Sequence, residues 1–243
     1  MKFLRRLLKP LLRRIFSQTF LSSLAGEWYL FTVRRKLPRL RRFYASRRNL
    51  LLNIGTGGGG REGWINIDAY PCAGVNCLVD CRHELPFAGR SVRGIFSEHF
   101  LEHLRYPDEA GHFLKECLRV MQPGAVIRLI VPDCGAYLNA YASTGWKAIS
   151  ALRPLDEKRS EPGGHTYKTK MELVNEVLRQ GEEHKFGYDF ETLSLLMAEA
   201  GFVNVQLSRF GASLDPALLL DFEHRAPESL YVEAIAPPAL RPA

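Results

Sequence analysis

Five glycines lie within six positions, 55–60, between two short apolar stretches in NLLLNIGTGGGGREGWINID, residues 49–68. Glycine has no side chain and adopts backbone conformations that other residues avoid, so a ligand can approach such a loop closely. The second stretch ends at Asp68, whose carboxylate can accept hydrogen bonds from both hydroxyls of a ribose. A further acid, Asp80, ends the next apolar stretch, where it can accept from an adenine amino group. The spacing of Gly55, Gly57, Asp68 and Asp80 therefore indicates a site for a nucleoside.

The glycines also fit the dinucleotide pattern G-x-G-x-x-G, through Gly55, Gly57 and Gly60. A dinucleotide site needs a full helix directly after the glycines, because the N-terminus of that helix binds the pyrophosphate. Only nine residues, 55–63, separate the two apolar stretches, which is too few for such a helix. The acid also follows early, thirteen residues after Gly55. The sequence therefore disfavours NAD and favours a nucleoside cofactor without phosphates.

These residues need a sheet to bring them together, and the chain from residue 49 onward predicts one. Short apolar runs alternate with helical stretches. The candidate strands are Asn49–Ile54, Trp64–Ile67, Val75–Val79, Val92–Ser97, Ala125–Val131, Phe202–Phe210 and Ser229–Ala236. Helices are expected over about residues 107–121 and 190–200, the second with Asp189 capping its start and Gly201 its end. This alternation predicts an α/β fold with a mostly parallel sheet and helices on both faces, whose carboxyl edge holds the site.

The first 48 residues differ from the rest of the chain in charge. They contain fourteen Lys or Arg and one acid, Glu27, whereas the whole chain of 243 residues has a net charge of +7. In MKFLRRLLKPLLRRIF, residues 1–16, apolar pairs recur every four residues, so a helix there has one apolar stripe beside basic side chains. Such a helix is typical of binding to an anionic membrane surface, while docking on the protein's own domain and RNA binding are alternatives. We therefore divide the chain into a basic segment, residues 1–48, and a domain over residues 49–243.

Four segments occur in an order that points to a family: LLNIGTGGGGREGWINID, ELPFAGRSVRGIFSEHFLEHL, FLKECLRVMQPGAVIRLIVPD and HKFGYDFETLSLLMAEAGF. Over about residues 49–133 and 182–210 they resemble the class I S-adenosylmethionine-dependent methyltransferases, and in particular a bacterial branch with GWINID and SEHxLEHL signatures. This resemblance implies a Rossmann-like, seven-stranded sheet whose last two strands form a hairpin. It also implies S-adenosylmethionine as the cofactor.

The resemblance further implies a set of cofactor-binding residues near the ends of the first four strands: Asn53, Gly55, Gly57, Asp68, Asp80, Ser97, Glu98 and His99. In this set Asp68 would bind the ribose and Asp80 the adenine side. The three residues that follow the fourth strand would line the pocket near the methionine and the substrate. Asn53 departs from the family pattern, since many members have an acid at this position that contacts the methionine amino group.

Transfer of a methyl group to an oxygen benefits from a base that takes the proton of the acceptor. His99 and Asp133 follow the fourth and fifth strands and are two candidates for this base. His165 is a third, in a long segment over about residues 134–188 that we expect to be a lid or an acceptor-binding insert. His99 and His103 have a spacing that could suit a metal, but no third ligand is evident beside them, and the resemblance implies none.

The expected activity is S-adenosylmethionine-dependent O-methylation of a small-molecule or glycan acceptor, such as a glycolipid intermediate, at a membrane surface. An RNA methyltransferase that uses the basic segment as an arm is one alternative, although SEHF stands where base-methylating enzymes have an NPPY-like signature. A non-catalytic binding protein with the same fold is another. Five cysteines, an odd number, suit a reducing compartment, so we expect a cytoplasmic protein at the inner face of the membrane.

Overall fold

The computed structural model describes residues 15–161 and 164–239. Its centre is a seven-stranded sheet in the order β3-β2-β1-β4-β5-β7-β6. The strands are β1 (Leu50–Ile54), β2 (Ile65–Asp68), β3 (Cys77–Leu78), β4 (Val92–Glu98), β5 (Met121–Pro132), β6 (Val203–Leu207) and β7 (Ser229–Ile235). The first five pair in parallel, whereas β7 runs antiparallel to both β5 and β6. The seven strands, their mostly parallel order and the closing hairpin confirm the α/β, Rossmann-like fold expected from the sequence.

The strands that differ most from their expected bounds are β3, β5 and β6, and β6 is shorter than expected at both ends. β3 contains only two residues, because it lies at the edge of the sheet and pairs with β2 alone. β5 is longer than expected, and it pairs with β4 on one side and with β7 on the other. A strand with partners on both edges can satisfy its backbone donors and acceptors along its length, which favours the longer strand.

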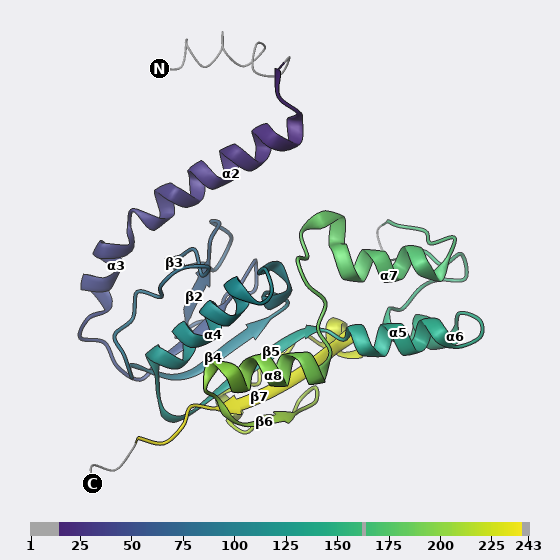
Figure 1. Cartoon of the computed structure of the whole chain (residues 1–243). Coiled ribbons are helices and arrows are strands. Elements are labelled where there is room, and N and C mark those ends of the chain that lie inside the picture. The colour runs from purple at the N-terminus through teal and green to yellow at the C-terminus, as the bar shows by residue number, and fades with distance from the viewer. Residues whose placement is uncertain (1–14, 162–163, 240–243) are drawn as a thin grey trace.

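Two long helices pack side by side on one face of the sheet (Figure 1): α4 (Asp108–Val120) and α8 (Phe190–Ala200). Both lie where the sequence predicts them. The Asp189 carboxylate accepts a hydrogen bond of 2.9 Å from the Thr192 amide at the start of α8. Gly201 ends the helix in the left-handed conformation, at φ +103°, which an L side chain rarely adopts.

The opposite face of the sheet carries short 3₁₀ helices in place of long α-helices. Residues 208–228 cover it and include η3 (Pro216–Leu218) and η4 (Glu223–Glu228), and Leu220 packs there against apolar side chains of β4, β5 and β7. Helices therefore lie on both faces, as expected, but those on this face are short 3₁₀ helices. The links from β1 to β2 and from β2 to β3 are too short for a full crossover helix.

A fully buried arginine joins residues 208–228, which we call the covering segment, to the sheet. The Arg128 guanidinium in β5 donates hydrogen bonds of 2.8 and 2.7 Å to the Asp221 carboxylate and one of 3.0 Å to Glu233. It also donates to two backbone carbonyl oxygens of the covering segment. Two carboxylates and one guanidinium are therefore removed from water together.

From residue 15 onward, two helices precede the sheet, α2 (Gln18–Arg34) and α3 (Leu37–Tyr44). Figure 1 shows α2 near the β3 edge of the sheet at its C-terminal end and projecting away at its N-terminal end. Leu30 in α2 is buried, and Tyr44 in α3 belongs to the main core. The described part of the basic segment therefore docks on the domain. The amphipathic pattern of residues 1–16 lies outside the described residues, except for its last two.

The other side of α2 is apolar and exposed. We call it the outer stripe and define it as Phe20, Leu24, Trp28 and Phe31, whose side chains are 44–62% exposed. These residues recur every three or four positions, so they lie on one side of the helix. Over residues 15–161 and 164–239, we find no helix with the length and apolar character needed to cross a membrane.

The long segment between β5 and α8 forms a helical lobe at one end of the sheet (Figure 1). It contains α5 (Cys134–Ala142), α6 (Lys147–Leu152), α7 (Lys170–Arg179) and η2 (Gln180–Glu182). These helices bury a small apolar cluster of their own, separate from the main core. The predicted insert is therefore a packed structural unit, while its role as a lid or an acceptor-binding site stays a prediction.

Candidate functional site

A cavity of about 860 Å³ lies at the carboxyl ends of β1, β2 and β4. Loops that follow the first four strands form most of its wall. It is completed by Leu30 from α2, Glu183 from the helical lobe, and Phe222, His224 and Arg225 from the segment 208–228. Parallel strands bring their carboxyl ends to one edge, so the cavity lies where open α/β sheets bind ligands. Its volume is in the range of sites that bind small molecules and cofactors.

The glycine loop after β1 forms the floor of the cavity. Gly55 has φ +72°, and a Cβ atom there would lie 2.4 Å from the Cβ of Phe100, so only glycine fits. Gly57 has φ +51°, but a Cβ atom there would meet nothing within 4 Å. The Asn53 side-chain amide donates 3.2 Å hydrogen bonds to the Gly59 carbonyl and the Asn66 side chain, and thereby holds the far end of the loop.

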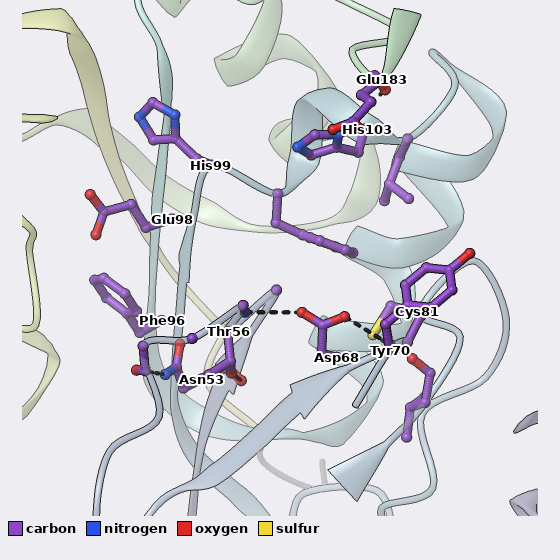
Figure 2. A pocket seen from close by; sticks show the side chains of 18 of the residues that line it. Asn53, Thr56, Asp68, Tyr70, Cys81, Phe96, Glu98, His99, His103 and Glu183 are labelled. Carbon is purple, nitrogen blue, oxygen red and sulfur yellow. Dashed lines mark hydrogen bonds between the residues drawn. The ribbon is translucent and has the colours of Figure 1, made fainter. Parts of the chain in front are cut away.

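Asp68 at the end of β2 lies beside the glycine loop in the cavity wall (Figure 2). Its carboxylate accepts hydrogen bonds from the backbone amides of Gly57 (3.0 Å) and Tyr70 (2.9 Å). Each carboxylate oxygen has a second lone pair, so two further hydrogen bonds can be accepted from a ligand. Tyr70 stacks on Tyr29 of α2, with 5.1 Å between the ring centroids, and extends the wall beside the acid.

Asp80 also lines the cavity, but two guanidinium groups already bind its carboxylate. Arg82 donates from Nε and from its second terminal nitrogen, each at 3.0 Å, and Arg34 of α2 donates at 2.8 Å. Burial opposes ionisation of Asp80, but the hydrogen bonds from Arg82 and Arg34 outweigh it and lower the pKa. An adenine amino group would therefore have to share this carboxylate with both arginines, so the adenine role of Asp80 stays a prediction.

Glu98 is the last residue of β4 and His99 follows it, and both lie on the opposite side of the cavity from Tyr70 (Figure 2). Glu98 accepts a 3.2 Å hydrogen bond from the Phe222 amide through Oε2, whereas its Oε1 is buried without a partner among the described residues. Burial raises the pKa of Glu98 to about 7. Burial lowers the pKa of His99 to about 2, so this imidazole is neutral. Its Nε2 lies 2.9 Å from the Ser229 hydroxyl.

Three residues predicted for the site lie elsewhere. The Ser97 hydroxyl donates to the Ile54 carbonyl at 3.0 Å, between β4 and β1, so it does not line the cavity. Asp133 caps α5 by accepting from the Ala136 amide at 2.8 Å. His165 is exposed in the helical lobe, with its ring 4.6 Å from that of Tyr167. His99 is the one predicted base that lines this cavity.

The structure also adds residues that sequence reasoning missed. Leu30, Phe222, His224 and Arg225 line the cavity, but they come from segments that carry no recognisable motif. They lie far from the glycine loop along the chain, so the sequence does not indicate that they line the cavity. Tyr70 could have been found, because a residue two positions after Asp68 must lie at the same edge of the sheet.

The architecture is a Rossmann-like, seven-stranded sheet closed by an antiparallel hairpin. Residues 67–129, which run from β2 into β5, match a family model described as a methyltransferase domain. This stretch includes Asp68, Asp80, Glu98 and His99. The match therefore supports a methyltransferase domain over this part of the chain. No curated protein sequence matches the chain.

Solved structures with a similar fold include a SAM-dependent methyltransferase from Archaeoglobus fulgidus, which is 17% identical. The alignment covers 84% of this chain and 94% of that chain, with a TM-score of 0.46. A putative methyltransferase of Haloferax volcanii, in complex with the Trm112 methyltransferase activator, is 13% identical over 82% of this chain and 88% of its own, with a TM-score of 0.45. Phosphoethanolamine N-methyltransferase 2 of Haemonchus contortus, in complex with S-adenosyl-L-methionine, is 12% identical over 84% of this chain and 52% of its own, with a TM-score of 0.42. This chain spans about half the length of that last enzyme.

Proposed function

We propose that the cavity binds S-adenosylmethionine and that the protein transfers the cofactor's methyl group to an oxygen acceptor. The observation that carries this proposal is Asp68, an acid held at the mouth of a glycine loop by the Gly57 amide. Its free lone pairs suit the two hydroxyls of a ribose. The methyl carbon would pass from sulfur to oxygen, the electron pair of the broken bond would stay on sulfur, and the acceptor's proton would pass to a base.

The loop geometry favours this cofactor over a dinucleotide. Residues 55–64 contain no helix, and the chain passes from the glycine loop directly into β2. A pyrophosphate would therefore lack the helix N-terminus that usually binds it. S-Adenosylmethionine contains no phosphate, so it does not need that helix.

Calorimetric titration of the full chain tests the proposal. We expect S-adenosylmethionine and S-adenosylhomocysteine to bind with dissociation constants on the order of micromolar. NAD, titrated in parallel, is expected not to bind. Absence of binding of either sulfur ligand below about 1 mM would refute the proposal. Binding without methyl transfer to any glycan, lipid or RNA acceptor would instead favour a non-catalytic binding protein.

Glu98 is the best-placed group to bind a positive charge or take a proton in the cavity. No residue that the structure describes bonds its Oε1, whereas the ring nitrogens of His99 face Ser229 and Glu102. Because the pKa of Glu98 is about 7, its carboxylate ionises as the pH rises through neutrality. The charged groups that face it are Arg225, Asp221 and Arg128.

We therefore expect S-adenosylmethionine to bind about three- to tenfold more tightly at about pH 8 than at about pH 6, since one added charge contact contributes about 1 kcal/mol. Calorimetry across this range measures the change. Glu98→Gln keeps an acceptor for the Phe222 amide but cannot ionise, so its affinity should depend less on pH than that of the wild type. Equal pH dependence of both proteins would exclude Glu98 as the cause.

For the acceptor, we propose a glycan or glycolipid intermediate at an anionic membrane surface, which the protein approaches through α2. Two observations support a lipid surface. The outer stripe exposes Phe20, Leu24, Trp28 and Phe31 on one side of the helix. The surrounding residues 1–48 carry fourteen basic side chains and one acid, which complement anionic headgroups. RNA is the competing partner for the same charge.

Replacing Leu24 and Trp28 together with serine is expected to weaken binding to phosphatidylglycerol vesicles by about tenfold or more, because each side chain loses about 1.5–3 kcal/mol of apolar burial. Vesicle co-sedimentation measures this loss. The matched control is Leu195→Ser with Leu207→Ser, whose side chains are 55% and 56% exposed outside α2. Binding to RNA but not to vesicles, or equal losses in both variants, would contradict the membrane proposal.

A further inference from the structure

A cluster of imidazole and carboxylate groups lies where the helical lobe meets the end of β4. Glu102 and His103 belong to η1 (Leu101–His103), directly after β4, and His184 follows η2 at the end of the lobe. The backbone amides of Lys185 and Phe186 donate to the Glu102 carbonyl at 2.7 and 3.3 Å, which holds the two segments together. One ligand atom from each of Glu102, His103 and His184 lies within 4.8 Å of those of the other two.

The Glu102 carboxylate has no hydrogen-bond partner in the described part of the chain. Its side chain is 1% exposed, and both oxygens are buried without a donor within hydrogen-bond distance among the described residues. The nearest ring nitrogens are Nδ1 of His99 at 3.6 Å and Nε2 of His184 at 3.9 Å from Oε1. Burying a carboxylate without a partner costs free energy. The Glu102 carboxylate is therefore suited to a positively charged partner that lies among the imidazoles.

The two ligand histidines are oriented as metal ligands usually are. Nδ1 of His184 lies 2.7 Å from the Val177 carbonyl, and Nδ1 of His103 lies 3.3 Å from the Glu183 carbonyl. A carbonyl oxygen can only accept, so Nδ1 carries the hydrogen in each ring and Nε2 keeps a lone pair in the neutral form. A ring whose other nitrogen donates to a backbone carbonyl is the usual support of a metal-binding histidine.

We propose that Glu102, His103 and His184 bind one Zn²⁺ ion. Two imidazoles and one carboxylate suit zinc, whereas Mg²⁺ prefers oxygen ligands. Zinc bonds of about 2.0–2.2 Å place tetrahedral ligand atoms about 3.4 Å apart, so the three side chains must move together by about 1 Å or less through rotation. His103 also lines the main cavity, so the fourth zinc position would face that cavity. The ion would connect the lobe to the edge of the sheet and supply the missing partner of Glu102.

Zinc binding is tested on the full chain after treatment with a chelator. Titration with Zn²⁺ is expected to show one tight site per chain and a rise in Tm, while Mg²⁺ gives neither. Co²⁺ in place of zinc should give visible absorption bands of a tetrahedral site with nitrogen and oxygen ligands. His184→Gln is expected to weaken zinc binding by about 100-fold or more. The matched control His165→Gln changes an exposed histidine of the same lobe and should bind zinc as the wild type does.

Glu102→Gln distinguishes a ligand from a residue that only supports the fold. It removes a buried charge, so the metal-free variant should unfold at the same or a higher temperature than the metal-free wild type, and it should bind zinc at least about tenfold more weakly. Three results would overturn the proposal: no stoichiometric zinc on the wild type, unchanged zinc affinity in both variants, or cobalt bands typical of thiolate ligands. The proposal does not rest on S-adenosylmethionine, so it can hold or fail independently of the proposed function.

Discussion

Asp68→Ala is expected to weaken S-adenosylmethionine binding by about 100-fold or more. Hydrogen bonds to a charged group contribute about 1.5–3 kcal/mol each, and the proposed contact with ribose contains two of them. The substitution also frees the Gly57 amide, which Asp68 holds at 3.0 Å, so the glycine loop loses its support from β2. Calorimetric titration of the cofactor into the variant measures the loss, and thermal unfolding checks that the variant is folded.

Asp133→Ala is the matched control for Asp68→Ala. Asp133 also follows a strand and also accepts from a backbone amide, but it caps α5 and does not line the cavity. Losing this cap should reduce the free energy of unfolding by about 1 kcal/mol, with cofactor affinity unchanged. If Asp133→Ala lost as much affinity as Asp68→Ala, the effect would come from general loosening of the sheet edge, and Asp68 would not be the ribose ligand.

The second large effect is expected on stability, at Arg128. Replacing Arg128 with methionine leaves Asp221 and Glu233 buried, at 3% and 1% side-chain exposure, without their guanidinium partner. Breaking one member out of a buried ion network costs about 3–5 kcal/mol, a large part of the about 5–15 kcal/mol that stabilises a typical domain. Urea unfolding of the variant and the wild type measures this difference in the free energy of unfolding.

Arg105→Met gives the comparison for an exposed ion pair. Arg105 is 74% exposed, lies just before α4, and donates to the Glu109 carboxylate in the first turn of that helix at 2.8 Å. Such pairs contribute about 0.5 kcal/mol or less. If Arg128→Met were no more destabilising than Arg105→Met, the two acids near Arg128 would have to be protonated or hydrated in the folded protein.

The sheet could be predicted from the sequence because each strand is a short apolar run bounded by turn residues. The bounds of α8 follow from the sequence for a similar reason, since Asp189 and Gly201 each act on the turn of helix next to them. The small helices of the covering segment were not predicted, because residues 208–228 have no period of their own and are held by contacts with Arg128.

The candidate site could be predicted only where a residue follows a strand. Asp68 and Glu98 lie at the carboxyl edge because parallel strands end there. The same reasoning placed Ser97 in the cavity, but alternate side chains of a strand point to opposite faces, so one position decides whether a residue reaches the ligand. His184 lies far along the chain from Glu102, and only the packing of the lobe brings them together.

One helix, α2, serves two surfaces at once. On its inner side, Leu30 lines the cavity and Arg34 donates a hydrogen bond to Asp80. Its outer side carries the outer stripe. A ligand bound in the cavity should therefore oppose the detachment of α2 from the domain. Thermodynamic linkage is reciprocal, so a partner that prefers α2 in its docked position must tighten the cofactor by the same factor by which the cofactor tightens the partner. Membrane attachment and cofactor occupancy would then act as two effectors of a single docking equilibrium.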